Sequence, residues 1–166
     1  GIKGNQLYEA LEQLEKIQLL EIYESQFQQG VQIRYSIHPT VRSFATSKLK
    51  AQPIVEEQVR EQWITYYINF AKRYLVQGDM QDHYWNAPAD IGLAPIDSEW
   101  SNLKTVLRWL AEHGRDEALV ALMTMLIHYL HKRGFYAERI EYAEKAARAA
   151  QRLGQNVLEA YFRIDG

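Results

Sequence analysis

His38 is the residue of greatest chemical interest, because it stands where the periodicity of the chain changes. Residues 31–37 alternate between apolar and polar side chains, which is typical of a strand with one face on a core. Pro39 has a fixed φ and no amide hydrogen, so it suits the first position of a helix. Apolar residues then recur at helical spacing as far as Leu49. We therefore predict a strand, then His38, then a helix whose free N–H groups lie beside the imidazole.

Two other groups of residues could in principle bind a metal ion. Asp79, Asp82 and His83 lie in a long irregular stretch, residues 78–97, and His128 and His131 are three residues apart on an expected helix. Neither group has a recognised set of ligands, so we interpret the first as part of a loop and the second as buried or edge histidines. We predict no metal site, and the absence of cysteine excludes disulfides and Cys-based zinc.

No arrangement typical of catalysis is present in the sequence. It contains no G-x-S-x-G, no H-E-x-x-H, no glycine-rich dinucleotide loop and no phosphate loop of the G-x-x-x-x-G-K-[ST] type. The carboxylates are scattered over amphipathic segments, where a solvated surface is the default interpretation. We therefore expect a chain that is not an enzyme and holds no cofactor of its own.

The elements around His38 predict the tail of a winged helix-turn-helix. An apolar stripe indicates a helix over residues 4–20, and residues 20–23 alternate as a short strand. Residues 24–30 join this strand to the next one, and Gly30 is free to take positive φ. Helix, strand, turn, strand and helix then follow in that order.

The rest of the chain predicts helices, and the whole fold is therefore expected to be mostly α. Residues 54–77 form a long helix, closed by Gly78, that is apolar on two sides. A helix capped by Asp97 or Ser98 follows the irregular stretch, and then come an almost wholly apolar helix, residues 117–132, and two further helices. We predict three parts: a winged-helix domain (1–52), a connector helix with a long loop (53–97), and antiparallel helical repeats that are cut short (98–166).

Composition argues for an ordinary globular protein. The chain has 166 residues, 47% of them hydrophobic, and a formal net charge of −2. This charge predicts no general attraction to nucleic acid or to an anionic membrane. The longest apolar run, residues 118–130, is too short to span a bilayer, and we recognise no signal peptide, so we expect a cytoplasmic protein.

Two phrases around the expected hairpin resemble a known family. LEQLEKIQLL (residues 11–20) followed by RYSIHPTVR (residues 34–42) is similar to the winged-helix domain of the bacterial signal-transduction ATPases of the NB-ARC/STAND group. Ile37-His38-Pro39 falls on the Met-His-Asp motif of that family, with Pro39 in place of the aspartate. The resemblance implies that His38 contacts the β-phosphate of ADP in a longer parent ATPase. Arg42 would contact the missing nucleotide-binding domain or an acidic group, or would simply be solvated.

Two later segments extend the resemblance. Residues 99–109 are similar to the helix that follows the winged helix in bacterial STAND regulators, and residues 132–153 resemble the turn and second helix of a tetratricopeptide repeat, with Gly134 at the turn. The resemblance implies that the chain is a regulatory fragment. Its partners would be the upstream nucleotide-binding domain, carrying ADP or ATP, and a protein or small-molecule ligand on the repeats.

Two alternatives stay open. The chain could be a DNA-binding winged-helix transcriptional regulator with a helical sensor or dimerisation domain, or a peptide-binding adaptor of repeat type. Against DNA, the first helix presents Glu9, Glu12 and Glu15 with only Lys16 nearby, whereas a helix that enters a groove must face phosphates.

Overall fold

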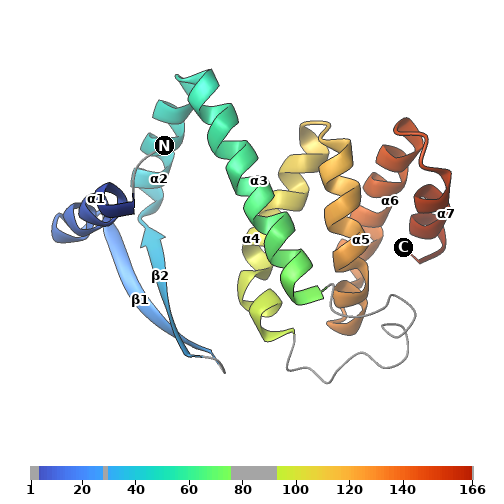
Figure 1. Cartoon of the computed structure of the whole chain (residues 1–166), viewed down its shortest axis with the longest axis horizontal. Helices are drawn as coiled ribbons and strands as arrows, with labels where there is room; N and C mark the ends of the chain where they lie inside the picture. The colour runs from blue at the N-terminus through green and yellow to red at the C-terminus, as the bar shows by residue number, and fades with distance from the viewer. Residues whose placement is uncertain (1–3, 28–29, 76–92, 166) are drawn as a thin grey trace. The chain divides into compact units, whose positions relative to one another are not determined.

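The computed structural model describes residues 4–27, 30–75 and 93–165 (Figure 1). Within these ranges the elements follow in the order α1 (Gly4–Lys16), β1 (Leu20–Phe27), β2 (Gly30–Ile37), α2 (Pro39–Lys50), α3 (Pro53–Leu75), α4 (Ala94–Glu112), α5 (Asp116–Lys132), α6 (Tyr136–Arg152) and α7 (Asn156–Asp165). The predicted fold class, mostly α with one β-hairpin, is confirmed. The chain divides into two compact units, Gly1–Val59 and Arg60–Gly166, with the boundary inside α3. None of the helices in the described ranges has both the length and the apolar character needed to cross a membrane.

The hairpin of the first unit is antiparallel, with Leu20 opposite Ile37 and Phe27 opposite Gly30. The first strand is therefore longer than the four residues predicted. The preceding helix is shorter than predicted and ends at Lys16, because Gln18 takes a positive φ of 58° and the Leu19 amide donates back to the Leu14 carbonyl. This left-handed residue stops the helix just before β1 begins.

Paired residues of an antiparallel hairpin share one face of the sheet. One face of this hairpin carries the pairs Ile22–Tyr35 and Glu24–Ile33, and the other face carries the pair Tyr23–Arg34. Of the described apolar residues in the first unit only Leu20 is buried, at 3% exposure. Several large apolar side chains remain exposed: Leu7, Tyr8, Ile17, Ile22, Tyr23, Ile33, Tyr35, Phe44, Ile54, Val55 and Val59. The core of the described structure therefore lies in the second unit.

The helix α3 begins at Pro53, as its fixed φ predicts. In the second unit it buries Ile64, Tyr67 and Ala71 in the core, while Tyr66 remains 56% exposed. The predicted cap, Gly78, lies outside the described residues.

The helix α4 begins earlier than predicted. Its N-cap is Leu93, and Pro95 lies in the first turn, where its missing amide hydrogen leaves no bond unmade. Asp97 and Ser98 are therefore inside the helix, and the Ser98 hydroxyl donates to the Pro95 carbonyl at 2.7 Å instead of capping. The prediction of a cap at Asp97 or Ser98 was wrong, because the sequence analysis placed residues 78–97 in an irregular stretch, whereas Pro95 lies in the first turn of α4.

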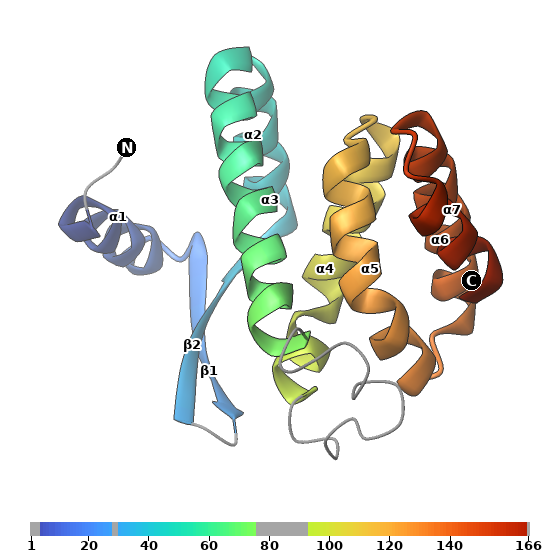
Figure 2. The same ribbon diagram turned by 45° about the vertical axis from the view of Figure 1, so that its right-hand side comes forward.

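The helices α4 to α7 form an antiparallel array, seen side by side in both ribbon views (Figures 1 and 2). Each connection is the same turn, with a glycine at positive φ: Gly114 at 63°, Gly134 at 72° and Gly154 at 70°. The residue after each glycine donates to a carbonyl five residues back, as in Arg115 to Leu110 at 3.0 Å. This is the Schellman motif, repeated about every 20 residues. A helix pair thus takes about 40 residues, which is longer than the 34 of a tetratricopeptide repeat.

The core of the second unit is built around α5 and α6. The predicted apolar centre, α5, buries Leu119, Leu122, Leu126, Tyr129 and their neighbours almost completely. The side of α6 that faces this core carries mostly alanine: Ala143, Ala146, Ala147, Ala149 and Ala150. Small side chains let neighbouring helices approach closely, which explains why α6 packs tightly between α5 and α7.

Replacing Gly134 by alanine is expected to lower the free energy of unfolding of the second unit by about 1–2 kcal/mol, since an L-residue at this φ is strained. A Cβ atom would meet only Tyr136 at 3.9 Å, so the cost comes from the backbone. Denaturant unfolding followed by tryptophan fluorescence measures it, because all four tryptophans lie between Trp63 and Trp109. Gly134→Asn is the control: asparagine tolerates this conformation better and should cost less.

Candidate functional site

His38 lies at the junction between β2 and α2, as predicted, and it is the N-cap of α2. Its side chain is exposed, and its Nδ1 accepts a hydrogen bond from the Thr40 amide at 3.3 Å. The ring therefore satisfies one of the free N–H groups of the helix, the role usually filled by serine, threonine, aspartate or asparagine. Arg42 is exposed in the first turn of the same helix.

Replacing His38 by alanine is expected to weaken the first turn of α2 by about 1 kcal/mol, because the Thr40 amide loses its acceptor. Amide hydrogen exchange at Thr40 measures this as a loss of protection. His38→Asn keeps an acceptor and should retain the protection. Equal exchange in both variants would show that the imidazole does not act as a cap.

Charges in the first unit are segregated along the chain. Between Glu24 and Glu56 there is no acidic residue, while four cationic residues lie there: Arg34, Arg42, Lys48 and Lys50. All four belong to β2 and α2, and Arg42, Lys48 and Lys50 are exposed. In contrast, α1 and β1 carry five exposed glutamates: Glu9, Glu12, Glu15, Glu21 and Glu24. We call β2 and α2 the cationic segment. The net charge of the whole chain conceals it, but the gap between acidic residues could have revealed it.

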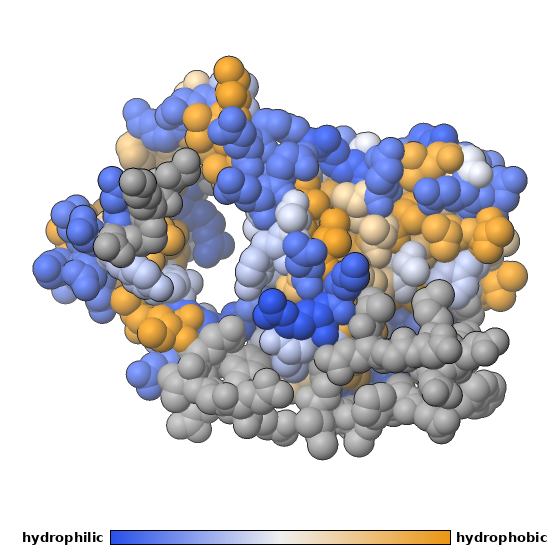
Figure 3. Space-filling view, in the orientation of Figure 1, coloured by the Kyte–Doolittle hydropathy of each residue, from blue (hydrophilic) through white to orange (hydrophobic). Residues whose placement is uncertain are grey.

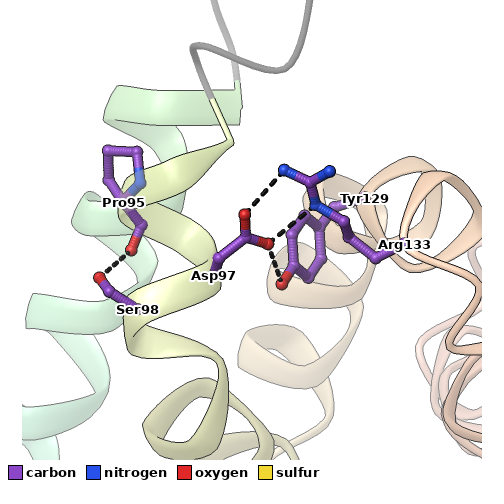
Figure 4. Close-up of polar contacts among 5 residues, drawn as sticks. All are labelled: Pro95, Asp97, Ser98, Tyr129 and Arg133. Atoms are coloured by element: carbon purple, nitrogen blue, oxygen red, sulfur yellow. Dashed lines mark hydrogen bonds and ion pairs between the residues drawn. The ribbon is translucent and has the colours of Figure 1, made fainter. Parts of the chain in front are cut away.

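Hydrogen-bonded ion pairs connect the ends of the array helices, and we call each such group a clasp. Asp97 in the first turns of α4 accepts bonds from the end of α5 (Figure 4): from Arg133 Nε at 2.9 Å and Nη2 at 2.7 Å, and from the Tyr129 hydroxyl at 3.0 Å. Burial, and then the hydrogen bond to Asp97, raise the pKa of Tyr129, which keeps its hydroxyl a donor. The clasp therefore fixes the position of the N-terminal end of α4 relative to the C-terminal end of α5.

A second clasp repeats this arrangement one helix later. Asp116 at the start of α5 accepts from Arg152 at the end of α6, at 2.7 Å from Nε and 2.6 Å from Nη2. The Arg152 hydrogen bonds hold the pKa of the Asp116 carboxyl below its usual range. Both pairs are bidentate, which fixes orientation as well as distance.

A buried carboxylate links α3 to α4. Glu99 is 8% exposed, and its Oε2 accepts from the Tyr67 hydroxyl at 3.0 Å and from Asn102 Nδ2 at 2.7 Å. Burial raises the pKa of Tyr67, and the neighbouring Glu99 raises it further. The tyrosine thus remains protonated and supplies a hydrogen-bond donor to a carboxyl group that has little contact with water.

Aromatic side chains surround Arg60 in the second unit. Its Cζ lies 5.6 Å from the ring centroids of both Trp63 and Trp109, within the range of cation–π attraction. The His113 ring stacks on Trp109 with centroids 4.2 Å apart and planes inclined by 13°. We interpret this cluster as packing between α3 and α4.

The two histidines of α5 point to different partners. His128 Nε2 lies 3.0 Å from the Tyr161 hydroxyl of α7, and His131 Nδ1 lies 3.1 Å from Arg139 Nη1 of α6. The sequence predicted that they are buried or edge histidines, and in the structure His128 is half-buried and His131 is exposed. Among the described residues no cluster of three or more metal-ligating side chains is found. The other group considered, Asp79, Asp82 and His83, lies outside the described residues.

The amino-acid sequence of the chain is similar to part of a regulator of transcription. The chain is 33% identical over 165 residues to the transcription activator GutR of Bacillus subtilis (strain 168). The alignment covers 99% of this chain but 19% of GutR, so the chain spans about a fifth of the length of that relative. No family model matches the chain, and no solved structure matches it.

This similarity corrects the resemblance drawn from the sequence. The prediction of a fragment of an NB-ARC/STAND signal-transduction ATPase was wrong, because the match along the whole chain is to a transcription activator. The physical reason lies in the phrase Ile37-His38-Pro39. In the structure it is the end of a strand, an N-cap and a proline in the first turn, which is a geometry that any strand-to-helix junction can use. The nucleotide role expected of His38 followed from that resemblance and has lost its support.

Proposed function

We propose that this chain is part of a cytoplasmic, non-catalytic transcription regulator that contacts DNA through its first unit and uses its helical array as a sensor or assembly domain. Its similarity over nearly the whole chain to a transcription activator carries this proposal. The net charge and the glutamates of the first helix argued against DNA as a partner, whereas the similarity to a transcription activator argues for it.

The charge pattern of the first unit selects the surface for DNA. Phosphates are contacted by arginine, lysine and tyrosine side chains, and these contacts supply most of the non-specific affinity. The cationic segment offers Arg42, Lys48 and Lys50 on α2 and Arg34 on β2. The helix α1 carries exposed glutamates and would be repelled, so we do not place it in a groove. The proposal therefore assigns the contact to β2 and α2.

The experiment is a binding titration with a fluorescently labelled, random-sequence DNA duplex at a series of salt concentrations. The unaltered chain should bind with an affinity that falls as salt rises, because each contacted phosphate releases counterions. Each of the substitutions Arg42→Gln, Lys48→Gln and Lys50→Gln should make the slope of log affinity against log salt shallower by about one. The triple variant should make it shallower by about three.

Lys132→Gln is the matched control, since Lys132 is exposed on α5 and belongs to the second unit. It removes the same charge and should leave the slope unchanged. Glu12→Gln on α1 should also leave the slope unchanged. An equal effect of Lys132→Gln would mean that the slope reports the net charge of the chain and not a contact of β2 and α2 with DNA. The absence of binding at low salt would overturn the assignment of DNA contact to this chain.

A further inference from the structure

The outward side of α2 carries a row of three hydroxyl groups. Thr40, Ser43 and Ser47 follow the i, i+3, i+7 spacing of one helix face, and all three are exposed. The apolar side of the helix lies opposite this row, where Val41 and Leu49 are half-buried. In the first unit, Figure 3 shows exposed apolar groups on the hairpin and near the start of α3. The hydroxyl row of α2 is a polar surface instead.

Cationic side chains lie on both flanks of the hydroxyl row, and α2 contains no acidic residue. At about 100° per residue, Lys50 and then Arg42 follow on one side of the row, and Lys48 lies on the other side. Between the row and Lys48 lies Phe44, the one large apolar side chain that is exposed on α2 among the described residues. The Lys48 Nζ is 5.4 Å from the centroid of the Phe44 ring, so a cation–π contact holds the ammonium group on its flank.

This cross-section suits a helix that lies in the major groove of double-stranded DNA. The groove is about 12 Å wide and admits one α-helix, with base edges at its floor and phosphates along both of its walls. Small side chains at the centre of the helix face allow it to approach the floor. Long cationic side chains on the two flanks can then contact phosphates of both strands.

Hydroxyl groups at the floor of the groove have a suitable acceptor at every step. Each base pair contains one purine, and the purine N7 accepts hydrogen bonds in the major groove. The hydroxyl row extends over seven residues, or roughly 10 Å along the axis of α2. Because base pairs follow one another at about 3.4 Å, the row can contact about three consecutive base pairs.

We infer that α2 lies in the major groove of double-stranded DNA and that Thr40, Ser43 and Ser47 donate to purine N7 atoms there. This inference rests on the proposed DNA contact and adds to it the groove and the residues that contact bases. It gives the two kinds of side chain on α2 different roles. The cations contribute affinity for any sequence, whereas the hydroxyl row contributes a preference among sequences.

Selection from a pool of randomised DNA duplexes is the first test. The unaltered chain should enrich duplexes with purines at fixed positions within a few consecutive base pairs. The variant Thr40→Ala/Ser43→Ala/Ser47→Ala should enrich none, yet its affinity should depend on salt as steeply as that of the unaltered chain, because all the cations remain. Ser101→Ala, at an exposed position of α4, is the matched control and should enrich the same duplexes as the unaltered chain.

The second test replaces the purines of the enriched duplex by 7-deazapurines. These bases carry a C–H group in place of N7 and leave the minor groove and the phosphates unchanged. For the unaltered chain, each contacted N7 that is removed should weaken binding by about threefold to tenfold, the usual effect of one hydrogen bond between neutral groups. The triple alanine variant should bind the natural and the 7-deaza duplex equally.

The outcomes separate this inference from the proposed function. No binding to any duplex would overturn both. Salt-dependent binding without an enriched sequence would leave the proposed function standing and overturn the inference, and the hydroxyl row would then face water or another part of a longer protein. Equal affinity of the unaltered chain for natural and 7-deaza duplexes would also overturn it. So would a sequence preference that survives in the triple alanine variant, since the base contacts would then come from another element.

Discussion

Replacing Ala146 by leucine is expected to lower the free energy of unfolding of the second unit by about 3 kcal/mol. Ala146 is fully buried on α6, which packs against α5 on one side and α7 on the other. The larger side chain has no space to enter, so it must push neighbouring helices apart, and overpacking of this kind typically costs 1–3 kcal/mol. Urea unfolding followed by tryptophan fluorescence measures the change.

The matched control for this prediction is Ala137→Leu in the same helix. Ala137 is exposed, and alanine and leucine have similar helix propensities, so this substitution should change stability by less than about 0.5 kcal/mol. Equal effects at the two positions would mean that the alanine side of α6 is not closely packed.

Replacing Glu99 by alanine is expected to cost about 3 kcal/mol, because it leaves the Tyr67 hydroxyl and the Asn102 amide without their acceptor. Tyr67→Phe removes only the donor and should cost about 1–2 kcal/mol. The double variant should cost less than the two single variants together, since both remove the same bond. Additive losses in this cycle would mean that the two groups do not interact. Glu117→Ala, at an exposed position of α5, is the control.

The same network predicts a dependence on alkaline pH. The pKa of Tyr67 is raised in the folded state, so the folded protein holds a proton that the unfolded chain releases above about pH 10. Its contribution to stability is therefore fully present below that pH and is lost as the pH rises. In the Tyr67→Phe variant the free energy of unfolding should fall less steeply as the pH rises through this range, which urea unfolding followed by tryptophan fluorescence measures.

The elements of the fold could largely be predicted from the sequence, because their signals are local. Alternation in β2, Pro39 and Pro53 at helix starts, and Gly134 at a turn each act within a few residues. The start of α4 was missed because Pro95 is compatible with two interpretations, a breaker or a first-turn residue. The positive φ of Gln18, which ends α1, has no signal in its residue type.

The candidate sites were harder to predict because they depend on partners that are distant in the sequence. Glu99 has the pattern of an ordinary helix residue until Tyr67 from α3 is placed against it. The clasp between Asp97 and Arg133 likewise joins two helix ends. The cationic segment was visible in the sequence, but a net charge of −2 averages it with the glutamates of α1 and β1. Charge must therefore be considered by segment before nucleic acid is excluded as a partner.

The identical turns at Gly114, Gly134 and Gly154 have a consequence for how the array forms. Neighbouring helices make contacts between residues that are close in the sequence. Folding therefore does not require the closure of a long loop before native contacts can form. Folding of the array can therefore begin at any pair of neighbouring helices and spread from there to the next helix on either side.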